Sequence, residues 1–196
     1  MEDTRVSSRL AKALEVSPQF KVLNDHSSPG AIKAILELLQ STAKVALLTD
    51  AGTPGISDPG ADLVDRCYEL GIEVDAVPGP SAVTNAVVLS GFFAQRFAFL
   101  GFLPRKPGPA KKVFEPFAEN SMTLVLFESP HRFKKTLEVA ENVLGKRRYA
   151  ICREMSKLHQ QVYRDTLPSL PSDSEVPAKG EFTLVIEGAR TPKNPS

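Results

Sequence analysis

The segment spanning residues 44–71 places the tightest limit on how this chain folds. Its sequence, KVALLTDAGTPGISDPGADLVDRCYELG, passes from a short apolar run through a loop with three glycines and two prolines into a pattern of helical spacing. A short apolar run bounded by glycine and proline is typical of a buried strand. Connections between such elements usually span about 4–6 residues, and longer ones are often functional. The pattern therefore predicts a buried strand and a helix joined by a long loop with a functional role.

The same alternation of apolar run and helical pattern continues on both sides of this segment. We expect strands at residues 20–23, 44–50 and 72–79, and helices at residues 6–14, 31–40, 61–71 and 80–91. Strands that alternate with helices are typical of a parallel sheet covered by helices. The first half of the chain is therefore predicted to be an α/β domain with a parallel sheet.

The order of the elements changes in the second half of the chain. There we expect strands at residues 96–102, 123–129, 147–155, 160–167 and 181–188, a helix at residues 130–145, and a basic, proline-rich loop at residues 103–112. Strands that follow one another with little helix between them favour antiparallel pairing. We therefore expect an N-terminal α/β domain at residues 1–93, a C-terminal α+β domain with a mixed sheet at residues 94–189, and a disordered polar tail at residues 190–196.

The composition of the chain excludes several classes of protein. The chain has 196 residues, a formal net charge of +1 and 42% hydrophobic residues. These values suit one or two globular domains and give no overall attraction to nucleic acid or membrane. No apolar segment approaches the ~20 residues of a membrane helix, and the charged N-terminus is not a signal peptide. Cys67 and Cys152 match no metal-site spacing or disulfide framework. We expect a cytoplasmic protein without a bound metal.

Two glycine- and proline-containing loops are the candidate ligand-binding segments. They cover residues 50–60 and 77–82, and each follows a predicted strand. Ligands of open α/β sheets bind beyond the carboxyl ends of the strands. Glycine allows the backbone to approach a ligand closely, and proline fixes the loop shape in advance. The loops therefore predict a pocket for a small polar molecule, with two tight structural turns as the alternative. Neither loop has a dinucleotide or Walker motif.

Six motifs follow one another along the chain: LLTDAGTPGISDPG, VPGPSAV, GFLPRK, LFESPHR, CREMSKLH and KGEFTLVIEG. Together, over residues 2–188, they resemble the ribosomal RNA small subunit methyltransferase I family of the tetrapyrrole (corrin/porphyrin) methylase superfamily. The resemblance implies a two-domain tetrapyrrole-methylase-like fold with S-adenosylmethionine in a cleft between the domains, and usually a homodimer. It also implies methyl transfer to a ribose 2′-hydroxyl of a cytidine in 16S rRNA, with 16S rRNA or the 30S subunit as the partner.

The resemblance also implies roles for individual residues. The residues expected to contact S-adenosylmethionine are Asp50, Ala51, Gly52, Thr53, Pro54, Ser57, Asp58, Pro78, Gly79, Ser81, Ala82, Phe127, Glu128, Gly180 and Glu181. Those expected to contact RNA are Glu2, Asp3, Arg5, Arg105, Lys106, Arg132, Arg153, Glu154 and Lys157. The candidate catalytic residues are Glu128 and Lys157. A structural ion pair of Glu128 with Arg132 or Arg153 is the alternative, because a buried carboxylate is costly unless it is paired.

The start of the sequence departs from the family pattern. Family members normally begin with a strand and a loop resembling TPIGNL ahead of AEDTR, whereas this sequence opens at Met1 directly into EDTR. The resemblance therefore implies an N-terminal domain truncated at its start. Two alternative functions remain open: a tetrapyrrole-methylase relative that acts on a corrin precursor or a modified protein histidine, and a cofactor-binding protein without catalytic activity.

Overall fold

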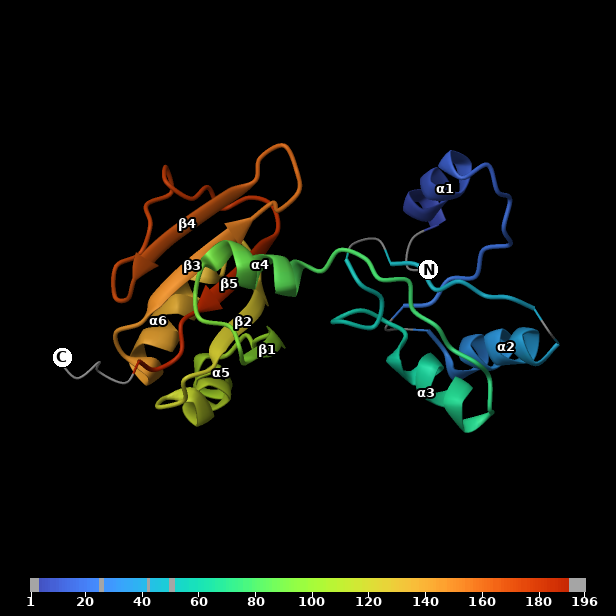
Figure 1. The fold of residues 1–196 in the computed structure, drawn as a ribbon, viewed down its shortest axis with the longest axis horizontal. Coiled ribbons are helices and arrows are strands. Elements are labelled where there is room, and N and C mark those ends of the chain that lie inside the picture. Colours follow the sequence, from blue (N-terminus) through green and yellow to red (C-terminus); the bar gives the residue numbers. More distant parts are fainter. Residues whose placement is uncertain (1–3, 25–26, 42, 50–51, 191–196) are drawn as a thin grey trace. The chain divides into compact units, whose positions relative to one another are not determined.

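The structure of the chain is a computed structural model that describes residues 4–24, 27–41, 43–49 and 52–190 (Figure 1). The chain divides into two compact units, Met1–Ser81 and Ala82–Ser196. Each unit contains its own cluster of buried apolar side chains. The residues expected to form a disordered tail fall outside the described part of the chain, except for Arg190.

The described part of the first unit contains three helices: α1 (Thr4–Ala13), α2 (Pro29–Gln40) and α3 (Ala61–Glu69). All three were predicted from helical spacing. α2 starts with a proline, which the first turn of a helix tolerates because the first N–H groups have no partner within the helix. A small core joins α2 and α3, and its buried members are Leu23, Ile35, Leu36, Leu63 and Cys67.

The strand prediction for the first unit is wrong within the described residues. The segments predicted as strands at residues 20–23, 44–50 and 72–79 form no ladder in the part that the structure describes. Their apolar residues still pack as the pattern implies, because Leu23 is buried and Leu47, Ile72 and Val74 pack against the same core. A strand also needs a neighbouring segment that presents its N–H and C=O groups in register. A hydrophobic pattern reports burial and carries no information about that partner.

The second unit is built on a five-stranded sheet with the strand order β1-β2-β5-β3-β4. The strands are β1 (Phe97–Phe102), β2 (Thr123–Glu128), β3 (Arg148–Arg153), β4 (Gln161–Thr166) and β5 (Phe182–Ile186). β1 and β2 run parallel, and the other neighbouring pairs are antiparallel. The five strands and the mixed sheet predicted for the second half of the chain are confirmed.

Helices cover both faces of this sheet (Figure 1). α4 (Ala82–Ser90) packs on one face, where Val125, Ala150 and Val185 are buried. α5 (Pro107–Phe114) and α6 (Phe133–Leu144) pack on the other face. Alternate residues of a strand point to opposite faces, so strands covered on both sides read as continuous apolar runs. This explains why TLVLF and FTLVI contain no polar alternation beyond threonine.

One helix of the second unit was not predicted. Residues 103–112 were expected to form a basic loop, but α5 (Pro107–Phe114) begins within them and continues into a short 3-10 helix, Glu115–Phe117. Pro107 and Pro109 both lie in the first turn of α5, where proline needs no hydrogen-bond partner. The prolines that indicated a loop therefore mark the start of a helix.

The division into compact units falls between Ser81 and Ala82, earlier in the chain than the domain boundary expected after residue 93. α4 lies with the second unit because Val83, Ala86 and Val87 pack against the sheet. No helix in the described residues is long and apolar enough to cross a membrane. Across the same residues, no group of three or more histidine, cysteine, aspartate or glutamate side chains could hold a metal ion.

Cys67 lies in the first unit and Cys152 in the second, so the reactivity of each thiol measures the opening of its own unit. Cys67 in α3 is 4% exposed and Cys152 in β3 is 1% exposed. Burial raises the pKa of Cys152 to about 11, and burial also raises the pKa of Cys67. At pH 8 we expect Cys152 of the native protein to react with Ellman's reagent about 100-fold more slowly than in urea, because the reactive thiolate is scarce.

The variant Cys67→Ser assigns the remaining signal to Cys152 and so separates opening of the second unit from opening of the first. Rapid labelling of Cys152 in native buffer would contradict the buried position of β3.

Candidate functional site

One hydrogen bond joins the two glycine- and proline-containing loops of the first unit. Thr53 Oγ1 donates to the carbonyl of Pro80 at 3.1 Å. Thr49 Oγ1 donates to Asp58 Oδ2 at 2.7 Å, which ties the two ends of the first loop together. The sequence predicted that these loops lie together, but it did not single out Thr49. A hydroxyl residue at the end of an apolar run, close to an aspartate-proline turn, is the signal that could have found it.

The backbone of the first loop has positive φ angles and a close approach that restrict which residues can stand there. Gly60 has φ +135°, and a Cβ atom added there would lie 2.5 Å from Leu47 Cδ2. Ser57 has φ +57°, in the left-handed region that residues with a side chain adopt rarely. Gly52, Thr53 and Pro54 are exposed, so the loop presents small residues and backbone groups to a ligand. Strained backbone of this kind is frequent at ligand-binding loops.

Several of the expected site residues cannot be placed. Asp50 and Ala51 of the first loop, and Glu2 and Asp3 near the start of the chain, lie outside the described residues. Arg5 lies in α1, where the structure describes its backbone. The assignment of these five residues to cofactor or RNA contact stays a prediction.

A charged cluster forms at one end of the sheet in the second unit, where β3 ends and β5 begins. Lys157 Nζ lies 3.2 Å from Glu154 Oε1 and 3.0 Å from Glu181 Oε2. Glu154 Oε1 also accepts a hydrogen bond from the backbone N–H of Glu181 at 2.8 Å. Gly180 has φ +95°, which residues with a side chain rarely adopt, and a Cβ atom there would lie 2.6 Å from Glu154 Cδ, so glycine leaves room for this carboxylate. The structure thus brings together the CREMSKLH and KGEF motifs.

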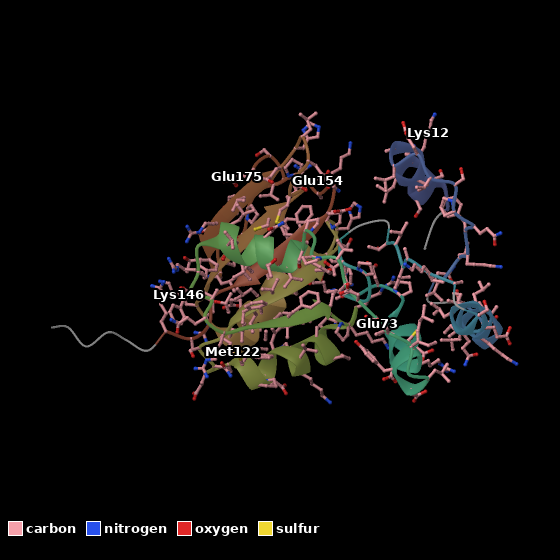
Figure 2. The ribbon with its side chains drawn as sticks, turned by 45° about the vertical axis from the view of Figure 1, so that its right-hand side comes forward. Lys12, Glu73, Met122, Lys146, Glu154 and Glu175 are labelled. Atoms are coloured by element: carbon pink, nitrogen blue, oxygen red, sulfur yellow. The ribbon has the colours of Figure 1, made fainter. Side chains whose placement is uncertain are left out.

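The arginine next to this cluster organises the surrounding loops. Arg153 Nε donates to the carbonyl of Lys179 at 2.6 Å, and one of its terminal nitrogens donates to the carbonyl of His159 at 3.2 Å. Figure 2 shows Glu154 at the opposite end of the second unit from Lys146, which marks the two ends of β3. Arg153 therefore fixes the backbone on either side of the cluster and does not pair with Glu128.

Hydrogen bonds within the cluster set its charge. The hydrogen bond from the backbone N–H of Glu181 holds the pKa of Glu154 below its usual range. The hydrogen bond to the carboxylate of Glu181 raises the pKa of Lys157 above its usual value. Both groups are therefore charged at neutral pH. The raised pKa disfavours Lys157 as a general base, because a base must first lose that proton. Lys157 can instead act as a fixed cation.

Glu128 is fully buried and already has its partners. Its Oε2 accepts a hydrogen bond from Thr136 Oγ1 at 2.5 Å, and its Oε1 accepts one from the backbone N–H of Ser129 at 2.7 Å. Arg132 Nε lies 3.4 Å from Glu128 Oε1. Arg132 also donates to the carbonyl of Leu103 at 3.0 Å, which connects the GFLPRK and LFESPHR motifs. These contacts favour the structural ion pair with Arg132 over a direct role in chemistry.

Phe127, the residue before Glu128, faces the opposite side of the sheet. Its ring centroid lies 4.9 Å from that of Phe99 and 5.6 Å from that of Phe102. Phe102 is 59% exposed, so this aromatic group extends from the core to the surface. Arg105 and Lys106, in the GFLPRK motif, are exposed at the start of α5. The second unit therefore presents an aromatic group, a basic turn and the charged cluster.

A family model and comparisons with solved structures define the class of protein. The family model of the Tetrapyrrole (Corrin/Porphyrin) Methylases matches residues 3–171. The crystal structure of the methyltransferase CobJ is similar with a TM-score of 0.66 and 14% identity, covering 98% of this chain and 90% of that one. A Thermus thermophilus uroporphyrin-III C-methyltransferase complexed with S-adenyl homocysteine has a TM-score of 0.58 and 18% identity, covering 90% and 80%. The fold is that of a tetrapyrrole methylase.

Curated relatives identify the branch of this class. A protein from Thermotoga maritima is 42% identical over 95% of this chain and 84% of its own length. One from Synechocystis sp. is 39% identical over 100% of this chain and 71% of its own length. One from Mycobacterium tuberculosis is 41% identical over 96% of this chain and 67% of its own length. All three are named ribosomal RNA small subunit methyltransferase I. The chain belongs to this family of methyltransferases, as its motifs predicted.

The contacts of Glu128 predict a structural effect on mutation. We expect Glu128→Gln to lower the free energy of unfolding by about 1–3 kcal/mol, because it removes the buried charge and replaces one of its two acceptor oxygens with an NH2 group that cannot accept. Urea denaturation measures this loss. Glu138→Gln changes an exposed glutamate on α6 and serves as the matched control. A Glu128→Gln variant that keeps wild-type stability but loses methyl transfer would instead indicate a direct role in chemistry.

The charged cluster predicts a dependence of stability on acid. The folded-state pKa of Glu154 is lowered, so its contribution is present above the unfolded pKa of about 4.3 and is lost as the pH falls through the folded pKa. We expect the wild-type protein to lose stability below about pH 4.3 more steeply than Glu154→Gln does. Lys157→Gln should shift this loss to higher pH without abolishing it, because the backbone hydrogen bond remains. Urea denaturation between pH 3 and pH 7 tests both statements, and parallel curves for all three proteins would refute them.

Proposed function

We propose that this protein transfers a methyl group from S-adenosylmethionine to the ribose 2′-hydroxyl of a cytidine in 16S rRNA. The hydrogen-bonded pair of loops in the first unit is the observation that carries the proposal. Thr53 joins loop 52–60 to the VPGPSA loop at 3.1 Å, and relatives that are 39% and 42% identical to this chain are named for the small-subunit rRNA. The fold belongs to a class of methyltransferases with a neighbour that is complexed with S-adenyl homocysteine.

The loop pair fits a small, polar, cationic cofactor. The loops present exposed backbone and small side chains, with no lysine or arginine between residues 52 and 60 that would repel a sulfonium. The proposed contacts in the first unit are Gly52, Thr53, Pro54, Ser57, Asp58, Pro78, Gly79 and Ser81, together with Asp50 and Ala51. The proposed contacts in the second unit are Ala82, Phe127, Gly180 and Glu181, and the buried Glu128 supports them without touching the cofactor. The cofactor would supply an electrophilic methyl group.

The residues of the second unit have to position the acceptor and manage its proton. Displacement at a methyl group depends mainly on in-line geometry, which fixed binding groups supply. The ammonium of Lys157, held by Glu154 and Glu181, is suited to stabilise negative charge that develops on the 2′-oxygen. Glu181 is the more exposed of the two carboxylates, so it is the better placed to accept the proton. In this proposal Glu128 supports the loops, and Lys157 touches the substrate.

The basic residues expected to contact RNA form two groups, those already bonded to backbone carbonyls and those that are exposed. Arg132 and Arg153 donate hydrogen bonds to backbone carbonyls, so they fix the loops that border the site. Arg105 and Lys106 are exposed and are available for phosphate. Glu2, Asp3 and Arg5 keep their proposed substrate role from the EDTR motif. The RNA would be bound as naked 16S rRNA or within the 30S subunit, in the cytoplasm, by a homodimer.

The test of the proposal begins with cofactor binding. We expect S-adenosylmethionine to bind the purified chain with one-to-one stoichiometry in calorimetry. Thr53→Val should weaken binding about fivefold, because the loss of one hydrogen bond between the loops costs about 1 kcal/mol. Ser174→Ala removes an exposed hydroxyl that pairs with Ser172 in the second unit and should have no effect. A folded chain that does not bind the cofactor would overturn the proposal.

Transfer of a labelled methyl group then identifies the acceptor. Label on 16S rRNA, offered naked or in 30S subunits, is the expected result, and its position in a ribose would be found by nuclease digestion and mass spectrometry. Label on a corrin precursor or a protein histidine would instead assign the chain to another acceptor. Cofactor binding without transfer to any of these would favour a cofactor-binding protein without catalytic activity.

A further inference from the structure

A pocket of about 230 Å³ lies at the end of the second unit where β3 begins and β4 ends. Its lining residues are Phe92, Arg148, Arg164, Asp165 and Thr166. The guanidinium carbons of Arg148 and Arg164 each lie 5.0 Å from the centroid of the Phe92 ring. Two arginines therefore share one aromatic ring, which favours cations near its face. None of the six motifs contributes to this pocket.

Strand register explains how residues far apart in sequence meet here. Arg148 pairs with Thr166, and Ala150 pairs with Arg164, in the antiparallel β3–β4 ladder. Ala150 is buried on the face covered by α4. Because alternate residues share a face, Arg148, Arg164 and Thr166 lie on that same face. Phe92 follows α4 and is 6% exposed in the same apolar cluster, so its ring is fixed beneath both arginines.

The pocket carries unbalanced positive charge. Arg148 forms two hydrogen bonds with Glu187, at 2.8 Å and 2.5 Å, and Glu187 is shared with Arg190 at 2.6 Å. One carboxylate therefore serves two arginines. Arg164 forms no ion pair with any residue that the structure describes. Its exposed guanidinium is the charge in the pocket that has no counterion among the described residues.

The neighbouring carboxylate does not neutralise Arg164. Asp165 accepts hydrogen bonds from Ser169 Oγ at 2.6 Å, from the backbone N–H of Thr166 at 2.7 Å and from the hydroxyl of Tyr163 at 3.1 Å. Asp165 pairs with Tyr149, whose side chain belongs to the core on the α5 and α6 face. The carboxylate of Asp165 is therefore satisfied on the other side of the sheet, while Arg164 faces the pocket.

We propose that this pocket binds a phosphodiester group of the RNA backbone. A guanidinium presents a planar fork of donors that matches phosphate, and stacking on an aromatic ring fixes its orientation in advance. The pocket has room for about seven water molecules, enough for a phosphate group. It is open to solvent, and Arg164 is exposed, which suits a group carried on a polymer. The inference rests on the proposed action on RNA.

The pocket lies far from the charged cluster, so a phosphate bound there would help to orient the RNA strand. Arg148 is the first residue of β3, and the Glu154–Lys157 cluster follows the last. At about 3.3 Å per residue, the two ends are separated by roughly 20 Å. Figure 2 shows Lys146 and Glu154 toward opposite ends of the second unit. A phosphate bound at Arg164 would belong to a nucleotide away from the methylated one, so the pocket would orient the strand without taking part in the chemistry.

The test is the salt dependence of RNA binding by the full chain. Binding of a fluorescently labelled single-stranded segment of 16S rRNA is measured by anisotropy at several KCl concentrations. We expect Arg164→Gln to weaken binding about three- to tenfold at 0.1 M salt and to reduce the slope of log K against log salt by about 0.7–1. Arg164→Lys should retain the slope and recover part of the affinity. Arg66→Gln removes an exposed arginine that pairs with Asp62 on α3 and is the matched control for net charge.

Several other results would overturn the assignment of this pocket to RNA. Wild-type affinity and slope in Arg164→Gln would overturn it, as would a wild-type chain that does not bind RNA. Saturable binding of inorganic phosphate that Arg164→Gln abolishes, with RNA binding unchanged, would also overturn it in favour of a small-anion site. Calorimetry with S-adenosylmethionine should give the same affinity for Arg164→Gln and the wild type. Arg164-dependent RNA binding without methyl transfer would refute the proposed function and leave the pocket assignment intact.

Discussion

β5 (Phe182–Ile186) lies in the middle of the sheet, hydrogen bonded to β2 on one side and to β3 on the other. All five of its residues are buried. The rest of the second unit depends on this position, because the β1–β2 pair and the β3–β4 pair have no ladder with each other except through β5. Burial on both faces gives the strand its stability, since the buried apolar area is the dominant favourable term in folding.

The same strand also determines where the charged groups lie. Phe182 pairs with Glu128 on β2 and with Arg153 on β3. Residues of the LFESPHR, CREMSKLH and KGEF motifs therefore meet at one end of these three strands. Glu181 and Gly180 precede β5, and their backbone meets the side chain of Glu154. The charged cluster is therefore a consequence of strand register. Its distances are set by the ladder and by one glycine that leaves room for a carboxylate.

The sequence predicted those features that depend on burial pattern alone. Strands β2 and β5 read as apolar runs because helices cover both faces, and α6 shows helical spacing. The same pattern at residues 44–50 was misleading, because a ladder needs a partner that an apolar run does not specify. α5 was missed because Pro107 and Pro109 are as compatible with a first helical turn as with a loop.

Contacts between distant residues were the least predictable part of the site. Glu128 and Arg153 flank Phe182 on either side of β5 and so lie on the same face of the sheet, one strand apart, whereas Arg132 lies four residues after Glu128 and reaches it directly. Phe92, Arg148 and Arg164 carry no motif, and they meet only through the register of β3 and β4 and the position of α4. The loops, in contrast, were identified from composition, because glycine and proline act on the local backbone.

The strand order has a consequence for synthesis on the ribosome. β5 is the last of the five strands of this sheet in sequence order, but it occupies the centre of the sheet. While the chain is being made, the β1–β2 pair and the β3–β4 hairpin can form early, and each then exposes an unpaired edge and an apolar face. The sheet is completed only after residues 182–186 leave the exit tunnel. Until then the nascent chain carries edges of the kind that chaperones protect from aggregation.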